Sequence, residues 1–150
     1  MVSNNDVWTI QLQLLKRLNI WARLNLICGL PLLLLPGQLW RSIGQQFLAW
    51  GSINFIIAVA GRRSFQKRFS ASSGNAQVAA KESTGLQRLL WVNSILDILY
   101  IGVGITLAKK DGCKNKSLSA HGLGVVIQGL GLFVIDLWHA LLLSRNSSGK

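Results

Sequence analysis

Residues 89–108, LLWVNSILDILYIGVGITLA, decide the fold of this chain. The stretch contains a single charged side chain, Asp97. A helix needs about 20 predominantly apolar residues to cross the hydrocarbon core of a membrane. The stretch therefore predicts a transmembrane helix, and Asn93 and Asp97 form a polar strip inside it.

Three further apolar blocks have a similar length and lie at about residues 18–38, 43–61 and 122–143. The chain of 150 residues is 50% hydrophobic and only 14% charged, whereas soluble domains carry about 25% charged residues. We therefore predict an all-α fold class: an integral membrane bundle of four transmembrane helices that forms a single domain over residues 1–150.

The first block has the weakest apolar character of the four. It contains Arg23 and Asn25, and Pro31 and Pro36 are expected to bend or end its helix. The preceding stretch, VWTIQLQLLKRL, has the amphipathic pattern of a helix that lies at the membrane interface. The short connection after the block, PGQLWRS, predicts that the first two helices are antiparallel neighbours.

Basic residues lie between the apolar blocks, in segments such as GRRSFQKRF and AKKDGCKNK. In a soluble protein the net charge of +11 would suggest that the protein binds nucleic acid. Loops that flank membrane spans carry the same charge pattern, so we expect no nucleic-acid partner. Residues 62–88 are predicted to be a basic loop, with residues 62–68 against anionic lipids of the bilayer.

The distribution of lysine and arginine also predicts an orientation. Most of these side chains lie in the N-terminal flank, in residues 62–88 and in the tail, residues 144–150. The positive-inside rule then places both termini and the basic loop in the cytoplasm of a cell whose membrane the chain crosses several times. The tail itself is predicted to be flexible.

Polar residues recur at a similar depth in all four blocks. At a rise of 1.5 Å per helical residue, each block has one about 10 to 12 Å below the basic surface: Asn25, Asn54, Asp97 and Asp136. Helical spacing adds neighbours on the same faces. The sequence thus predicts a polar intramembrane layer, with Arg23 and His139 as auxiliary members: Asn25, Asn54, Asn93, Asp97, Tyr100, Gln128 and Asp136.

The two aspartates need partners. A charged aspartate at the centre of a membrane helix costs about 2.5 to 3.5 kcal/mol, so such residues face a bundle interior or a cavity. Arg23 is the basic residue nearest to them in depth that is not at a helix end. An ion pair between Arg23 and either Asp97 or Asp136 is therefore one hypothesis. The glycines of HGLGVVIQGLGLF indicate close packing of the helix that carries Asp136.

Four motifs, WARLNLICG, WGSIN, VNSILDILY and GLGVVIQGLGLFVID, give the sequence a resemblance to a family of small bacterial four-helix membrane proteins of undescribed function. The resemblance covers most of the chain apart from its loops and tail. It implies a four-helix fold and no particular activity. The motif positions in this sequence are Trp21, Asn25, Gly29, Trp50, Asn54, Asn93, Asp97, Tyr100, Gln128, Gly129 and Asp136.

Three functions fit the polar layer. In the first, its side chains bond across helices and the protein is structural, or accessory to a membrane-protein partner. In the second, the layer binds or conducts a proton, a cation or a small polar ligand, and conduction would require a homo-oligomer. The third, an enzyme, has the least support, because two carboxylates and His139 are a thin ligand set for zinc or iron. We therefore expect no catalytic residue, no metal and no cofactor.

Overall fold

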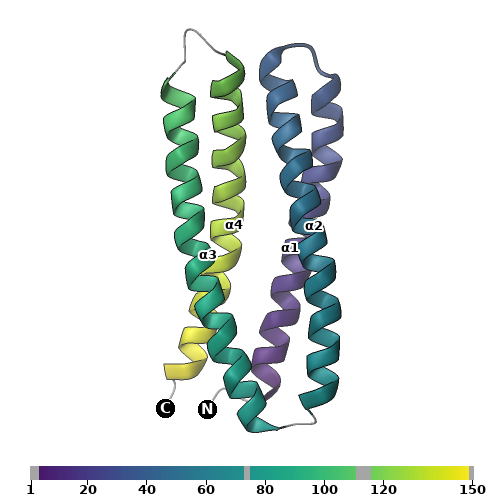
Figure 1. The fold of residues 1–150 in the computed structure, drawn as a ribbon, viewed down its shortest axis with the longest axis vertical. Coiled ribbons are helices and arrows are strands. Elements are labelled where there is room, and N and C mark those ends of the chain that lie inside the picture. Colours follow the sequence, from purple (N-terminus) through teal and green to yellow (C-terminus); the bar gives the residue numbers. More distant parts are fainter. Residues whose placement is uncertain (1–3, 73–74, 111–115, 149–150) are drawn as a thin grey trace.

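The fold consists of four long helices in a computed structural model that describes residues 4–72, 75–110 and 116–148. These are α1 (Asn4–Leu34), α2 (Gln38–Ser72), α3 (Ala76–Lys110) and α4 (Lys116–Ser148). Each helix runs the length of the molecule (Figure 1). The all-α, four-helix prediction is confirmed.

The helices form two antiparallel hairpins, α1 with α2 and α3 with α4, which lie side by side (Figure 1). The first hairpin turns at Gly37, whose φ of 105° lies in the left-handed region that glycine adopts readily. Pro31 lies within the last turns of α1, and the helix continues to Leu34. The start of α1, the end of α2, the start of α3 and the end of α4 lie at one end of the bundle (Figure 1). We call this the basic end.

Three of the helices, α2, α3 and α4, are long and apolar enough to cross a membrane. The helices contain 31 to 35 residues, which corresponds to about 46 to 52 Å. A hydrocarbon core is about 30 Å thick. Each helix therefore exceeds such a core by roughly 15 to 20 Å.

The largest difference from the prediction lies in residues 62–88. We expected a loop there, but α2 continues to Ser72 and α3 begins at Ala76. The segment mixes good helix formers such as alanine, arginine and glutamine with serines and glycines. A buried stripe at helical spacing holds the start of α3 in the bundle: Ala79, Ser83, Leu86 and Leu90. Likewise α4 reaches Ser148, so residues 144–148 are helical where we predicted a flexible tail.

The start of α1 also differs from the prediction. It is continuous with the rest of the helix, and its apolar side chains face the other three helices. The resulting apolar cluster of the basic end contains Val7, Trp8, Ile10, Leu14, Phe65, Ala79, Leu86, Leu90, Ala140 and Leu143. Trp8 packs edge-on against Phe65 and Phe69, with ring centroids 5.8 and 5.6 Å away. One face of residues 7–14 is thus part of the bundle core, whereas Thr9, Leu12 and Gln13 on the other face are exposed.

Glycines set the spacing of the helices nearer the opposite end. An added Cβ at Gly122 would lie 2.6 Å from the backbone nitrogen of Ala108 and 2.7 Å from the carbonyl oxygen of Gly104. Gly44 faces the carbonyl oxygen of Gly29 in the same way, at 2.9 Å. The close packing that we predicted for the glycines of α4 is confirmed, since small residues let helix backbones approach in lipid.

Replacement of Gly122 by alanine is expected to destabilise the bundle. The new methyl group meets backbone of α3, which has no rotamer with which to move away, and overpacking of this kind costs about 1 to 3 kcal/mol. Gly102→Ala is the matched control on α3, because nothing lies within 4 Å of an added Cβ there. It should be neutral or slightly stabilising, since alanine favours helix. Thermal unfolding of both variants in nanodiscs checks this, and equal melting temperatures would contradict the packing described.

Candidate functional site

The polar layer is built around a buried pair on α1 and α4. The side-chain amide of Gln128 donates a hydrogen bond to Oδ1 of Asn25, and Asn25 donates from Nδ2 to the carbonyl oxygen of Trp21 at 2.8 Å. Gln128 is fully buried and Asn25 is 2% exposed. Of the predicted residues, these two are therefore brought into direct contact.

Asp97 and Asn54 lie close to this pair in depth. An added Cβ on Gly129, the residue after Gln128, would lie 3.3 Å from the carbonyl oxygen of Asp97. An added Cβ on Gly51, one turn before Asn54, would lie 3.1 Å from the Cβ of Asn25. Both polar side chains are 4% exposed. Each of the four helices thus contributes one buried polar residue at this depth.

Asp136 lies farther toward the basic end. It follows Gly129 by seven residues, a rise of about 10 Å along α4. The backbones of the two aspartates are thus offset along the bundle, although their carboxyl groups remain close enough to interact. Asp136 is half-buried, hydrogen-bonds Asn93 of α3, and still interacts electrostatically with Asp97. His139 is fully buried and its Nδ1 lies 2.7 Å from the carbonyl oxygen of Ile135.

Several buried polar atoms of this region have no hydrogen-bond partner in the described part of the chain. They come from all four helices: Nε1 of Trp21, Nδ2 of Asn54, Oδ2 of Asp97, Oε1 of Gln128 and Nε2 of His139. An unsatisfied buried donor or acceptor costs about 1 to 3 kcal/mol, and native proteins contain few of them. Four of these atoms belong to the layer, whereas Nε2 of His139 lies farther toward the basic end, where Oε1 of Gln11 and Nε of Arg68 are also unpaired. The layer is a candidate site because it contains one unpaired buried atom from each of the four helices.

Space for part of this site is provided by Gly131. An added Cβ there would lie 2.2 Å from Cζ2 of Trp21, so the indole ring lies directly on the backbone of α4. The ring thereby brings its N–H into the same interhelical region as Gln128. A larger side chain at residue 131 would displace the indole.

Two predicted residues lie away from the interior. Tyr100 is 40% exposed and packs edge-on against Trp50 of α2, with ring centroids 5.4 Å apart. Arg23 is exposed and lines a groove between α1 and α2. The ion pair that we proposed for Arg23 with Asp97 or Asp136 is wrong, since the one salt bridge among the described residues joins Arg68 to Glu82 at 2.8 Å.

A second polar contact, which we did not predict, joins α2 to α4 near the end opposite the basic end. Gln38 donates to Oγ of Ser117 at 3.0 Å, and the hydroxyl of Ser42 lies 3.4 Å from the same atom. One turn farther, Nε2 of Gln46 lies 3.1 Å from Nδ1 of His121. The spacing of four residues along α2 was the available signal. The two hairpins are thus joined by polar bonds near this end as well as in the layer.

The described carboxylates, cysteine and histidines do not gather into a metal site of three or more ligands. Asp136 is hydrogen-bonded by the amide of Asn93, and Asp97 interacts electrostatically with Asp136. What the arrangement can do chemically is exchange hydrogen bonds and protons, because it combines carboxylates, amides, an indole and an imidazole.

This architecture defines a class, a four-helix all-α bundle with three helices apolar enough to cross a membrane and a buried polar layer between them. The model of a family of unknown function, DUF6992, matches residues 17–137, so the chain belongs to that family. The matched range contains the whole predicted layer and excludes His139. No curated protein and no solved structure matches the chain.

The bond between Asn25 and Gln128 gives a direct test of the layer. In a double-mutant cycle of Asn25→Leu and Gln128→Leu, we expect a coupling free energy of about 0.6 kcal/mol, and at most about 1.7, as for other membrane interhelical bonds. Thermal or denaturant unfolding of the four proteins in micelles provides the measurement. Gln128→Leu with Thr106→Val, an exposed residue of α3, is the control cycle and should be additive. Additivity in both cycles would contradict the bond.

Proposed function

We propose that the protein is a multi-pass protein of the cell membrane and that α1 crosses the bilayer together with the other three helices. Support comes from the outward surface, which exposes large apolar side chains along the middle of every helix. On α3 these are Leu89, Trp91, Val92, Ile95, Leu96, Ile98, Leu99 and Val103. Lipid is the solvent that such a surface requires. Because α1 packs antiparallel to α2 along its length, it must follow α2 across.

Charge supports an orientation in which the basic end is cytoplasmic. Arg62, Arg63, Lys67 and Arg68 all lie in the last turns of α2, and Lys81 and Arg88 lie in the first part of α3. The positive-inside rule places such a concentration of bases in the cytoplasm. Both ends of the chain follow, because α1 begins and α4 ends there (Figure 1).

Single cysteines test this topology. In a background without Cys28 and Cys113, we expect Gln38→Cys to react with a membrane-impermeant maleimide from outside sealed cells. Ser70→Cys and Thr9→Cys should react only after lysis, because both are exposed at the basic end. Labelling of Thr9→Cys but not of Ser70→Cys from outside would show that α1 does not cross. Labelling of Ser70→Cys from outside would reverse the orientation.

We propose further that the polar layer binds a proton or a small hydrated cation inside the membrane. The supporting observation is the set of unpaired buried polar atoms, which includes Oδ2 of Asp97. A purely structural layer would be expected to satisfy its own polar groups, because each orphan offsets the gain from an interhelical bond. Ionisable residues inside membranes are kept mainly for function.

The mixture of atoms indicates which species fit. Trp21 and Asn54 present donors, whereas Asp97 and Gln128 present acceptors. A bare cation requires acceptors on all sides, whereas ordered water or a hydrated ion uses donors and acceptors together. We propose neither a catalytic role nor a metal cofactor for the polar layer. Movement of the bound species across the membrane would require a homo-oligomer, because four helices from one chain enclose only a narrow path.

The competing function is structural or accessory, in support of a membrane-protein partner. The specific observation in its favour is that Gln128 with Asn25, and Asn93 with Asp136, do bond across helices. These bonds fix the register of α4 against α1 and α3. The same layer is therefore compatible with both functions. Substitution of Asp97 distinguishes them, because one oxygen of its carboxylate has no hydrogen-bond partner among the described residues.

Asp97→Asn should melt at the same temperature as wild type or higher, because it removes a buried charge at little change in shape, and residues retained for binding often reduce stability. When wild type in nanodiscs is tested against a series of pH values and cations, particular conditions should raise its melting temperature. A ligand present at 100 times its Kd adds about 2.7 kcal/mol. Asp97→Asn should lose this stabilisation.

Thr106→Val is the matched control for that experiment. Its hydroxyl bonds the carbonyl oxygen of Gly102 within α3, on the exposed face, so the response to pH and cations should be retained. A clearly lower melting temperature for Asp97→Asn, with identical responses in all three proteins, would favour the structural function.

A further inference from the structure

A groove between α1 and α2 gathers basic side chains beside an apolar surface. It has a volume of about 460 Å³ and lies at the junction of the apolar and basic parts of α2. Its cationic lining consists of Lys16 and Arg23 from α1 and Arg62 and Arg63 from α2. Asn19 and Gln66 add neutral polar groups. This groove is separate from the polar layer, which lies inside the bundle.

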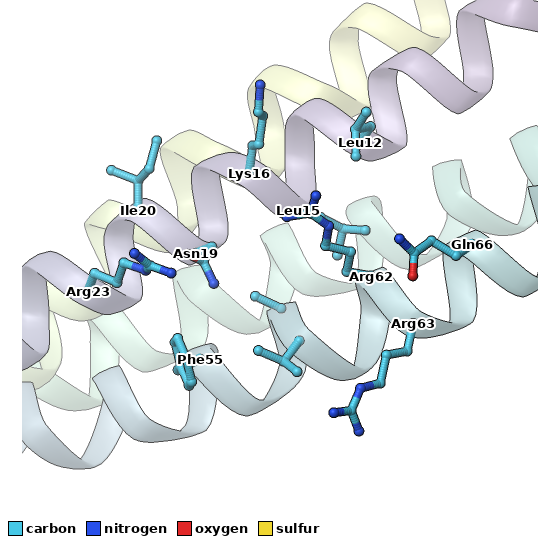
Figure 2. A pocket seen from close by; sticks show the side chains of 12 residues that line it. Leu12, Leu15, Lys16, Asn19, Ile20, Arg23, Phe55, Arg62, Arg63 and Gln66 are labelled. Carbon is cyan, nitrogen blue, oxygen red and sulfur yellow. The ribbon is translucent and has the colours of Figure 1, made fainter.

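The direction of the side chains follows from helix geometry. Side chains lean toward the N-terminus of their helix, and α1 and α2 are antiparallel. Arg23 therefore leans toward the basic end, and Arg62 leans toward the membrane, so the two approach each other from opposite directions. Figure 2 shows Arg23 and Asn19 on one side, and Arg62 and Gln66 on the other, directed into the space between the helices. Lys16 and Arg63 point away from it in this view.

No carboxylate is among the residues that line the groove. Of the described acids, Glu82 is paired with Arg68, and Asp97 and Asp136 lie on the other hairpin. The positive charge of the groove is therefore not neutralised by the described part of the chain. An anion with several acceptor oxygens, such as a phosphodiester, complements guanidinium groups that line one groove from two helices.

The remaining lining is apolar and identifies the source of that anion. The groove is completed by Leu12, Leu15, Ile20, Phe55, Ala58 and Val59. The surface continues toward the opposite end through side chains that are largely exposed, Leu24 at 49% and Ile56 at 66%. An acyl chain attached to the phosphate can lie along these residues, whereas a free phosphate ion makes no use of them.

We propose that this groove binds the headgroup of one anionic phospholipid, with Arg23 and Arg62 on its phosphate and its acyl chains against α1 and α2. The site rests on the proposal that the helices cross a membrane, and it is independent of any role of Asp97. It differs from general attraction of bases to an anionic surface, because it requires two residues of opposite helices at one position.

The test uses full-length protein in a neutral detergent, with its thermal stability measured against added lipid. Short-chain phosphatidylglycerol should raise the melting temperature in a saturable manner. Phosphatidylcholine of the same chain length and inorganic phosphate should not. In Arg23→Gln with Arg62→Gln, the apparent affinity for phosphatidylglycerol should fall at least tenfold, since removal of one cation weakens such binding about fivefold.

Arg88→Gln with Arg145→Gln is the charge-matched control, because both arginines are exposed on α3 and α4 outside the groove. Retained affinity in this protein supports the site, whereas an equal loss in both double variants overturns it in favour of net charge. Equal stabilisation by inorganic phosphate overturns the lipid as source. Equal stabilisation of wild type by the two lipids overturns the proposal without use of any variant. The cysteine-labelling experiment tests separately whether the helices cross the membrane.

Discussion

The close approach of helix backbones at glycine is the constraint on which the rest of this structure depends. In lipid, apolar side chains gain little by leaving one hydrocarbon environment for another, so packing and interhelical bonds hold helices together. Gly104 against Gly122, and Gly29 against Gly44, bring the two members of each hairpin together. Gly129 and Gly131 then let α3 and Trp21 contact the backbone of α4. Only at this spacing can Asn25 and Gln128 reach each other.

The two ends of the bundle are stabilised by different forces. At the basic end, where the helices extend beyond the thickness of a membrane core, the interior is a cluster of large apolar side chains such as Trp8, Phe65 and Leu90. Their burial from water is favourable in its own right. Toward the opposite end the interior becomes small and polar, with Ser42 and Gln46 facing Ser117 and His121. The polar layer lies between these regions, and this position separates it from water at either end.

Much of the fold could be predicted because apolar blocks of membrane length are a strong and local signal. The four helices, the short first connection and the tight glycine packing all follow from such signals. The last part of α2 and the first part of α3 could not be predicted in the same way, because residues 62–88 are polar. These segments are helical because Phe65, Ala79 and Leu86 are buried against helices distant in the sequence. The same dependence explains the start of α1, whose amphipathic stripe faces protein.

The candidate site was predicted in part, for a related physical reason. Depth along a helix follows from counting residues, so Asn25, Asn54 and Asp97 were placed near one another. Which way a side chain faces is set by tertiary packing, and this is why Tyr100 and Arg23 lie outside the interior. The pair of Gln128 with Asn25 also required knowledge of the relative shift of α4 and α1, which no local pattern contains.

Charge separation between the two hairpins is the last consequence of this packing. Arg23 and Asp97 both lie on membrane-crossing segments, and in a different register they would neutralise each other. Here Arg23 faces outward between α1 and α2, whereas Asp97 and Asp136 lie on the second hairpin and interact with each other. Asp136 is hydrogen-bonded by Asn93, but Arg23 and the second oxygen of Asp97 have no partner in the described chain. For the arginine, which opens to the bilayer, a lipid phosphate has the complementary charge and shape. For the aspartates, which lie between helices, the complementary partner is a small polar species such as a proton, water or a hydrated ion.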